Sequence, residues 1–295
     1  MDYREILKQA VDLHIHIGPE IIPRKFTLPG LVDYEKEKLK GVGVKNHFFP
    51  TVAMGKITDY SEPFVVNSVV LNHYVGGFNA DIIRASAELS TRPIIVWFPT
   101  IHAGNILKKQ RFEIPMEWIN PKLKKEIKPR LLKDIKGLSV FDSKGEIKEE
   151  VKNVSNIIKE CKAILATGHI SWQESQALIK FAIQKVGLKK VIITHPIYQK
   201  IDMPVEIQKE LVELGALIEH CYSMYSIDKI PMDKIAKQIK EVGARNCILS
   251  SDVGQPFSKS PSESLADFIF LLRQEGITER EIREMLVDNP AKLVG

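Results

Sequence analysis

The sequence has few of the features that mark several protein classes. It holds only three cysteines, Cys161, Cys221 and Cys247, and no C-x-x-C pair. A disulfide framework or a zinc–thiolate site is therefore not expected, and we expect the thiols to be small buried groups. No run of eighteen apolar residues occurs, which excludes a membrane-spanning helix. The first residues carry charges of both signs and no apolar signal core, so we expect a cytoplasmic protein without a membrane partner.

A strong charge of one sign is also missing. The chain has 42 Lys and Arg against 37 Asp and Glu, a formal net charge of +5. Nucleic-acid-binding domains are usually far more basic, so we expect a small-molecule substrate and no nucleic acid. The slight basic excess favours an anionic substrate. Gly41-Val-Gly43 precedes a strand and lacks a third glycine, so it is not a dinucleotide-binding fingerprint.

What the sequence does contain is a regular alternation of short β-branched runs with amphipathic helical stretches. The predicted strands are Val11–Ile17, Gly43–Phe49, Val65–Tyr74, Pro93–Pro99, Ala163–His169, Val191–Pro196, Ala216–Cys221 and Cys247–Val253. Eight strands alternating with helices predict an α/β fold, a (β/α)8 TIM barrel, and 295 residues suit one such domain spanning 1–295. A doubly wound open sheet is the competing fold, but it should carry a glycine-rich turn after its first strand.

Helix boundaries are marked by capping residues. Ser171–Glu174 and Ser260–Glu263 are capping boxes, and the second predicts a helix that ends at Gly276. Thr278-Glu-Arg-Glu281 opens a last helix, which we expect to stop at Asn289-Pro290.

One connection is too long for an ordinary barrel loop. Residues 103–160, between the fourth and fifth strands, are predicted to be an insertion. It contains a basic cluster at 121–133 and a predicted hairpin over Leu138–Ile147 that turns at Asp142–Gly145. On the catalytic face it would serve as a lid or an oligomer contact, so a homo-oligomer is possible. A solvated charged helix is the alternative for the basic cluster.

The first strand carries two histidines in alternate positions. Asp12, His14 and His16 are expected to share its inward face, with the apolar residues facing the helices. Two imidazoles buried together are costly unless they bind a metal ion or join a hydrogen-bond network. The strand therefore predicts a metal site.

The other histidines repeat this placement. Each lies at or just beyond the C-terminal end of a predicted strand: His47, His73, His102, His169, His195 and His220. The eighth strand leads into Asp252. Because barrel active sites are built at that end of the strands, we expect one catalytic face.

This arrangement resembles the amidohydrolase superfamily of metal-dependent hydrolases. The matching residues are, in chain order, His14, His16, His169, His195 and Asp252. The closing Asp288–Val294 is similar to the superfamily's frequent C-terminal helix, and the segment 13–51 looks like an uncharacterised branch. The resemblance implies that His14, His16 and His169 are metal ligands. It implies that His195 binds a second ion or orients water.

Imidazoles and a carboxylate suit a divalent ion, Zn²⁺ first and Mn²⁺ or Fe²⁺ as alternatives. Such an ion lowers the pKa of bound water, and Asp252, a further ligand, could take its proton as general base. Whether one or two ions bind stays open. Members of the superfamily with two ions bridge them from strand four, which here offers no acid or lysine before Pro99. Lys45 as a carbamate bridge, with His47 as a ligand, is one possibility, and a charged Lys45 that binds substrate or pairs with an acid is the other.

Further residues are predicted to contact the substrate. Glu20 and Arg24 follow the first strand, and His102 follows the fourth. Only one of Glu219 and His220 can face inward, and the strand-end position favours His220.

The predicted function is a metal-dependent hydrolase acting on an amide, lactone or ester bond of a small anionic substrate, with phosphate esters possible. A single-metal decarboxylase of a small carboxylic acid and a non-catalytic metal-binding barrel are the alternatives.

Overall fold

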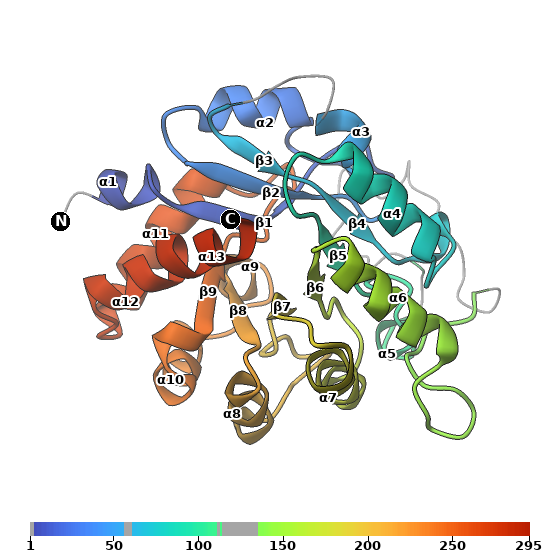
Figure 1. The fold of residues 1–295 in the computed structure, drawn as a ribbon. Coiled ribbons are helices and arrows are strands. Elements are labelled where there is room, and N and C mark those ends of the chain that lie inside the picture. The colour runs from blue at the N-terminus through green and yellow to red at the C-terminus, as the bar shows by residue number, and fades with distance from the viewer. Residues whose placement is uncertain (1–2, 56–60, 111–112, 114–134) are drawn as a thin grey trace.

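The computed structural model describes residues 3–55, 61–110, 113 and 135–295 (Figure 1). The strands within these ranges pair in parallel, in the order β1-β2-β3 and β4-β5-β6-β7-β8-β9. They are β1 (Val11–His16), β2 (Gly41–Lys45), β3 (Phe64–Val66), β4 (Ser68–Val70), β5 (Ile95–Trp97), β6 (Ile164–Ala166), β7 (Val191–Ile193), β8 (Leu217–Cys221) and β9 (Cys247–Ser250).

Two features close these strands into the predicted eight-stranded barrel. The third strand of the barrel is divided at Asn67 into β3 and β4, so that β3 pairs with β2 while β4 pairs with β5. The chain beyond β9 then returns to β1. Asp252 N donates to His14 O at 2.8 Å, and His16 N donates to Val253 O at 2.8 Å. The predicted α/β barrel is confirmed.

Helices surround the strands (Figure 1). They are α1 (Tyr3–Leu7), α2 (Leu28–Glu35), α3 (Val52–Gly55), α4 (Ala80–Leu89), α5 (Gly104–Leu107), α6 (Glu149–Glu160), α7 (Trp172–Lys180), α8 (Val205–Glu213), α9 (Tyr222–Ser226), α10 (Met232–Val242), α11 (Pro261–Gln274), α12 (Glu279–Arg283) and α13 (Asn289–Val294). Single turns are η1 (His73–Val75) and η6 (Ala244–Asn246), both 3₁₀, and η5 (Phe181–Val186) and η7 (Glu284–Asp288), both π-helical. None of the helices in the described part of the chain is long and apolar enough to cross a bilayer.

The hydrophobic core has two layers. One set of alternate strand residues, including Trp97, Ala166 and Ile192, fills the barrel interior, and Leu293 and Val294 of α13 pack against it. The other set packs outward against the helices. This division leaves the C-terminal ends of the strands for polar side chains.

Strand β1 departs from the predicted alternation. Its register against β2 shifts between Asp12 and Ile15, which marks a β-bulge. Leu13 therefore packs in the barrel interior, whereas Ile15 packs in the outer layer. The prediction that Asp12 and the two histidines share one uninterrupted face is wrong, because the extra residue changes the phase of the strand. Gly43 accommodates the bulge, since a Cβ there would lie 2.6 Å from the Leu13 Cα.

The capping boxes at Ser171 and Ser260 are confirmed. The last helix does not stop at Asn289-Pro290 as predicted. It continues through η7 into α13, whose first turn contains Pro290.

The predicted insertion is shorter than 103–160. Its last twelve residues form α6, the helix that precedes β6 in the ordinary barrel sequence. The predicted hairpin has one antiparallel bridge, Phe141 with Ile147, and its turn is held by Asp142, whose Oδ1 accepts from Glu146 N. The basic cluster at 121–133 lies outside the described residues.

Candidate metal centre

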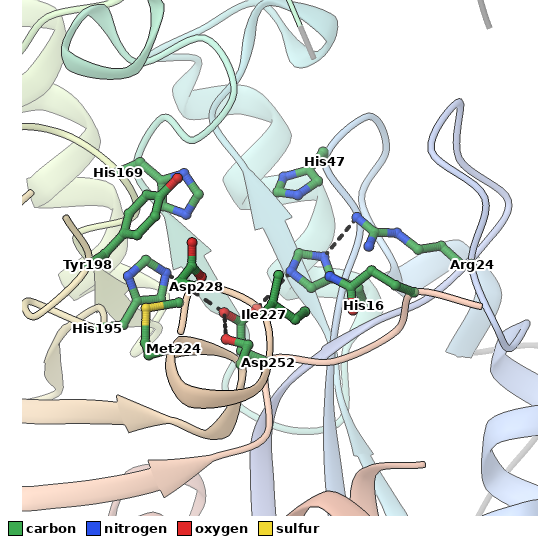
Figure 2. Close-up of a pocket in the computed structure, with 12 residues that line it drawn as sticks. His16, Arg24, His47, His169, His195, Tyr198, Met224, Ile227, Asp228 and Asp252 are labelled. Atoms are coloured by element: carbon green, nitrogen blue, oxygen red, sulfur yellow. Dashed lines mark hydrogen bonds and ion pairs between the residues drawn. The ribbon is translucent and has the colours of Figure 1, made fainter. Parts of the chain in front are cut away.

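Five of the eight histidines gather at the C-terminal end of the barrel, together with Asp252. Figure 2 shows four of them, His16, His47, His169 and His195, with Asp252. The ring centroids run in a chain, with His47 4.7 Å from His16, His16 5.3 Å from His14, His14 6.0 Å from His195 and His195 5.0 Å from His169. The sequence brings these residues from the ends of β1, β2, β6 and β7 to one place.

Three of these side chains aim possible ligand atoms at one another. Asp252 Oδ1 lies 3.0 Å from His14 Nε2 and 3.0 Å from His16 Nε2. Ligand atoms that share an ion at bonds of about 2.0–2.1 Å stand roughly 3.0–3.4 Å apart. The spacing of His14, His16 and Asp252 therefore fits a divalent ion.

Two neighbours fix the ring of His14. Glu219 Oε2 lies 3.1 Å from its Nδ1, and a carboxylate can only accept, so Nδ1 carries the proton and Nε2 presents its lone pair. Lys45 Nζ lies 2.9 Å from that Nε2 and 4.1 Å from the centre of the Trp97 ring. A cationic group thus already faces the lone pair that a metal ion would use.

The orientation of β8 differs from the prediction. Glu219, not His220, faces His14, and Cys221 Sγ also approaches the Nδ1 of His14, at 3.9 Å. His220 is buried on the opposite side of the strand, where neither ring nitrogen has a hydrogen-bond partner among the described residues. The expectation that His220 faces inward is wrong. Glu219 occupies the inward-facing position, and the next side chain of a strand points to the opposite face.

A buried ion pair stands beside His16. Arg24 Nε lies 2.6 Å from Glu20 Oε2, and Arg24 Nη2 donates to His16 Nδ1 at 3.2 Å (Figure 2). Because guanidinium groups only donate, His16 carries its proton on Nε2, toward Asp252. Glu20 also accepts from the backbone N–H of His47, which ties the loops after β1 and β2 together.

His47 completes a second set of possible ligands. Its Nδ1 lies 2.9 Å from Thr100 Oγ1, and His16, Glu20 and His47 bring ligand atoms within 4.8 Å of one another. Glu20, however, is already paired with Arg24.

His169 and His195 occupy strained strand ends. Gly168 has φ +61°, and a Cβ there would lie 2.2 Å from Phe98 O, so only glycine fits before His169. His195 (φ +22°) and Asp252 (φ +51°) also have positive φ, which is uncommon for side-chain-bearing residues and clusters at functional sites. His195 Nε2 lies 4.0 Å from Asp252 Oδ2, which accepts from Ser223 Oγ at 2.7 Å.

Burial sets the charge of these groups. It lowers the pKa of His16, His47 and His169 well below the usual value, and that of His195 to about 4. The imidazoles are therefore neutral at neutral pH, the form that binds metal ions.

The acid and the lysine of the site stay charged. Burial alone would raise the pKa of Asp252, but the adjacent His14 and His16 outweigh it and hold that pKa well below normal. Burial also lowers the pKa of Lys45 to about 8, which leaves it mostly protonated near pH 7.

The remaining histidine pair forms a separate cluster. His102 accepts from His73 N at 3.0 Å, and its Nε2 lies 2.9 Å from Glu113 Oε1. Tyr74 OH donates to the same carboxylate oxygen at 2.6 Å. Both ring nitrogens of His102 are thus engaged within this cluster, outside the pocket at Asp252, and its substrate role stays a prediction.

The pocket above Asp252 also contains residues that the sequence reading did not single out. They are Tyr198, Ser223, Met224, Ile227, Asp228 and Gln255. They lie in the segments after the strands, Ser223 and Met224 in the short helix α9 and the others in loops, where no periodic pattern identifies inward-facing positions. The predicted His16, Arg24, His47, His169 and His195 line the same pocket.

The charges of the buried groups bear on the number of ions. Among the described residues at the centre, Asp252, Glu219, Glu20 and Asp228 are acidic, whereas Lys45 and Arg24 are basic. The set carries a net charge of −2, which one divalent ion changes to 0 and two change to +2. Because excess buried charge is costly, this balance favours one ion while Lys45 is an ammonium group.

Comparison with known proteins places this geometry in context. A family model described as "Family of unknown function (DUF6282)" matches residues 9–219. No curated protein matches the sequence. Similar solved structures include an amidohydrolase from Pseudomonas aeruginosa, with 11% identity, a TM-score of 0.56 and coverage of 99% of this chain and 98% of that one.

Two further structures are similar to the same degree. A TatD homologue from Escherichia coli K12 has 12% identity, a TM-score of 0.56 and coverage of 98% of each chain. A dihydroorotase has 14% identity, a TM-score of 0.56 and coverage of 97% of this chain and 69% of that one. The predicted resemblance to the amidohydrolase superfamily is confirmed in the fold.

Proposed function

Because the chain belongs to the DUF6282 family, whose description assigns no reaction, we propose its function from the site: it is a metal-dependent hydrolase. Its reaction is the attack of an activated water on an amide, lactone or ester bond of a small substrate, with phosphate esters as a further class. The observation that carries the proposal is the convergence of His14 Nε2 and His16 Nε2 on Asp252 Oδ1, next to the pocket that His16 and Asp252 line.

The residues present suit a divalent ion, Zn²⁺ before Mn²⁺ or Fe²⁺. His14, His16 and Asp252 would hold it, with His169 and His195 beside them. When bound, such an ion lowers the pKa of a water molecule toward neutrality and polarises the bond to be cleaved. Glu219 supports the site from behind, because a carboxylate on Nδ1 orients a ligating imidazole and raises its basicity.

Asp252 is the proposed general base. Its Oδ1 faces the two histidines of β1, and its Oδ2 is directed toward His195 and Ser223. The low pKa of Asp252 keeps it ionised and able to accept a proton from water, which it then returns to the leaving group. Neutral His195, 4.0 Å away, would orient the water or the bond being cleaved.

Lys45 determines how many ions the charges allow. As an ammonium group beside His14 it fits one ion and could contact an anionic substrate. As a carbamate it would replace a positive charge with a negative one, and two ions would then be balanced, with His47 as a further ligand. We propose the one-ion form, because the pKa of about 8 leaves Lys45 protonated at neutral pH.

The one-ion balance also supports a second candidate reaction. A single divalent ion with neutral imidazoles and an ionised aspartate could decarboxylate a small carboxylic acid. The two reactions differ in product, since decarboxylation releases carbon dioxide and hydrolysis releases an acid with an alcohol or amine.

The test is a substrate panel with the purified protein and added Zn²⁺ or Mn²⁺. It contains lactones, N-acyl amino acids, carboxylic esters, phosphodiesters and small carboxylic acids, with acid and carbon dioxide release both monitored. Hydrolysis of one class, lost in Asp252→Asn and kept in the exposed control Asp233→Asn, is the expected result. Turnover by Asp252→Asn equal to that of the wild type, or no turnover of any class by the loaded protein, would overturn the proposal.

A further inference from the structure

Two side chains with hydrogen-bond donors line the pocket from loops that are joined to each other. Arg24 is in the loop after β1 and Gln255 is in the loop after β9, and both line the pocket that contains Asp252. Their chain neighbours are joined directly, because Lys25 N donates to Gly254 O at 2.7 Å. Two loops far apart in the sequence are thus adjacent, and one contributes a guanidinium and the other a side-chain amide to the same pocket.

The amide of Gln255 is oriented by its own contacts. Its Oε1 accepts from Gly254 N at 3.1 Å and from Ser258 Oγ at 3.0 Å. Since a backbone N–H requires an acceptor, this end of the amide must be the oxygen, and Nε2 is the end left for the pocket. Gly254 packs so closely that a Cβ would lie 2.2 Å from His16 O, which fixes this loop against β1.

Glu20 holds the guanidinium of Arg24 in place but engages only part of it. Glu20 takes the Nε–H, and Nη2 contacts His16 Nδ1. An ion on Nε2 of His16 would put the ring proton on Nδ1, so Arg24 would then need a different acceptor. If Arg24 served only to neutralise Glu20, its side chain would not need to line the pocket.

We infer that Arg24 and Gln255 form a binding site for a free carboxylate of the substrate, separate from the bond that is cleaved. This inference rests on the proposed function and narrows its substrate to amides, lactones or esters that carry a carboxylate. A planar guanidinium and an amide NH₂ are donors that match the two oxygens of a carboxylate.

Binding of simple dicarboxylates to the ion-loaded protein tests this inference. Malonate, succinate and glutarate can place one carboxylate at the ion and the other at Arg24 and Gln255, whereas acetate reaches only one of them. By titration calorimetry we expect at least one dicarboxylate to bind ten or more times more tightly than acetate. Equal affinity of acetate and all three dicarboxylates would overturn the inference.

The sharpest variant is Gln255→Glu. It keeps the acceptor for Gly254 and Ser258 but replaces the donor with a carboxylate, so dicarboxylate affinity should fall by more than tenfold. Arg24→Gln should have a similar effect, and the exposed control Arg280→Gln should have none. Unchanged dicarboxylate binding in a folded Gln255→Glu protein, as judged by its melting temperature, would refute the site.

The inference and the proposed function can fail separately. A protein that binds an ion and hydrolyses neutral esters, but does not distinguish dicarboxylates from acetate, disproves only the carboxylate site. If no ion binds, acetate titrated into the metal-free wild type and Gln255→Glu proteins still decides the question. Acetate affinity lost in the variant supports the carboxylate site, and equal affinity refutes it.

Discussion

Glu219 Oε2 lies 3.1 Å from His14 Nδ1, on the side of the ring opposite Lys45 and Asp252. This contact fixes the tautomer of His14 and directs Nε2 toward the other ligand atoms. It also explains why β8 turns an acid inward where an aliphatic side chain would otherwise fill the barrel.

Glu219→Gln should therefore weaken metal binding. The amide can still accept from Nδ1 but loses the negative charge that makes the imidazole a better ligand. Outer contacts of this kind are worth about 10- to 100-fold in metal affinity, and we expect a loss of about tenfold in competition with a chelating dye. The matched control Glu213→Gln, exposed on α8, should bind like the wild type. Equal affinity in both variants would show that Glu219 does not support the ion.

Gly43→Ala should be strongly destabilising. The new methyl group would lie 2.6 Å from the Leu13 Cα and carbonyl oxygen, so the bulge that precedes His14 would have to move. Overpacking of this kind costs about 1–3 kcal/mol of the free energy of unfolding. Gly30→Ala in α2 is the control, since the nearest atom to its Cβ is 3.5 Å away. Urea unfolding curves that coincide for the two variants would contradict this role of Gly43.

Asp12→Asn should change how stability depends on pH. Burial raises the pKa of Asp12 from 3.8 to about 7, while its Oδ1 accepts from the N–H groups of His14 and Ser251. A raised pKa means that the protonated acid stabilises the fold fully below pH 4, and that this contribution is lost as pH rises toward 7. Asparagine keeps the acceptor and does not titrate.

Compared with wild type, Asp12→Asn should therefore gain about 2–3 kcal/mol of unfolding free energy between pH 5 and pH 8. The comparison is made on metal-free protein, so that ion binding does not enter. Asp233→Asn, exposed on α10, should follow the wild-type curve. Parallel curves for Asp12→Asn and wild type would show that Asp12 titrates normally.

Much of the barrel and part of the site could be predicted from the sequence, because strand ends are visible in it. His169, His195 and Asp252 each follow a short apolar run, and parallel strands bring such ends together. The bulge at Leu13 could not be predicted, because the alternation of polar and apolar residues in the sequence does not show where a strand contains an extra residue. Gly43 was its only signal, and a glycine in a strand has several explanations.

The loop residues of the pocket could not be predicted from the sequence for a different reason. Asp228 and Gln255 lie in segments without a periodic pattern, so neither their direction nor their neighbours follow from spacing. The choice of His220 over Glu219 failed because the pattern shows that the strand alternates but not which residue starts inside.

The metal content of the purified chain tests the central claim most directly. After saturation with Zn²⁺, Mn²⁺ or Fe²⁺ and removal of the excess, elemental analysis should find one ion per chain for at least one of these metals. The ion should be lost in His16→Ala, which removes one of the three converging ligand atoms. No bound ion under any of these conditions would contradict the metal centre, and two ions per chain would contradict the charge balance at Lys45.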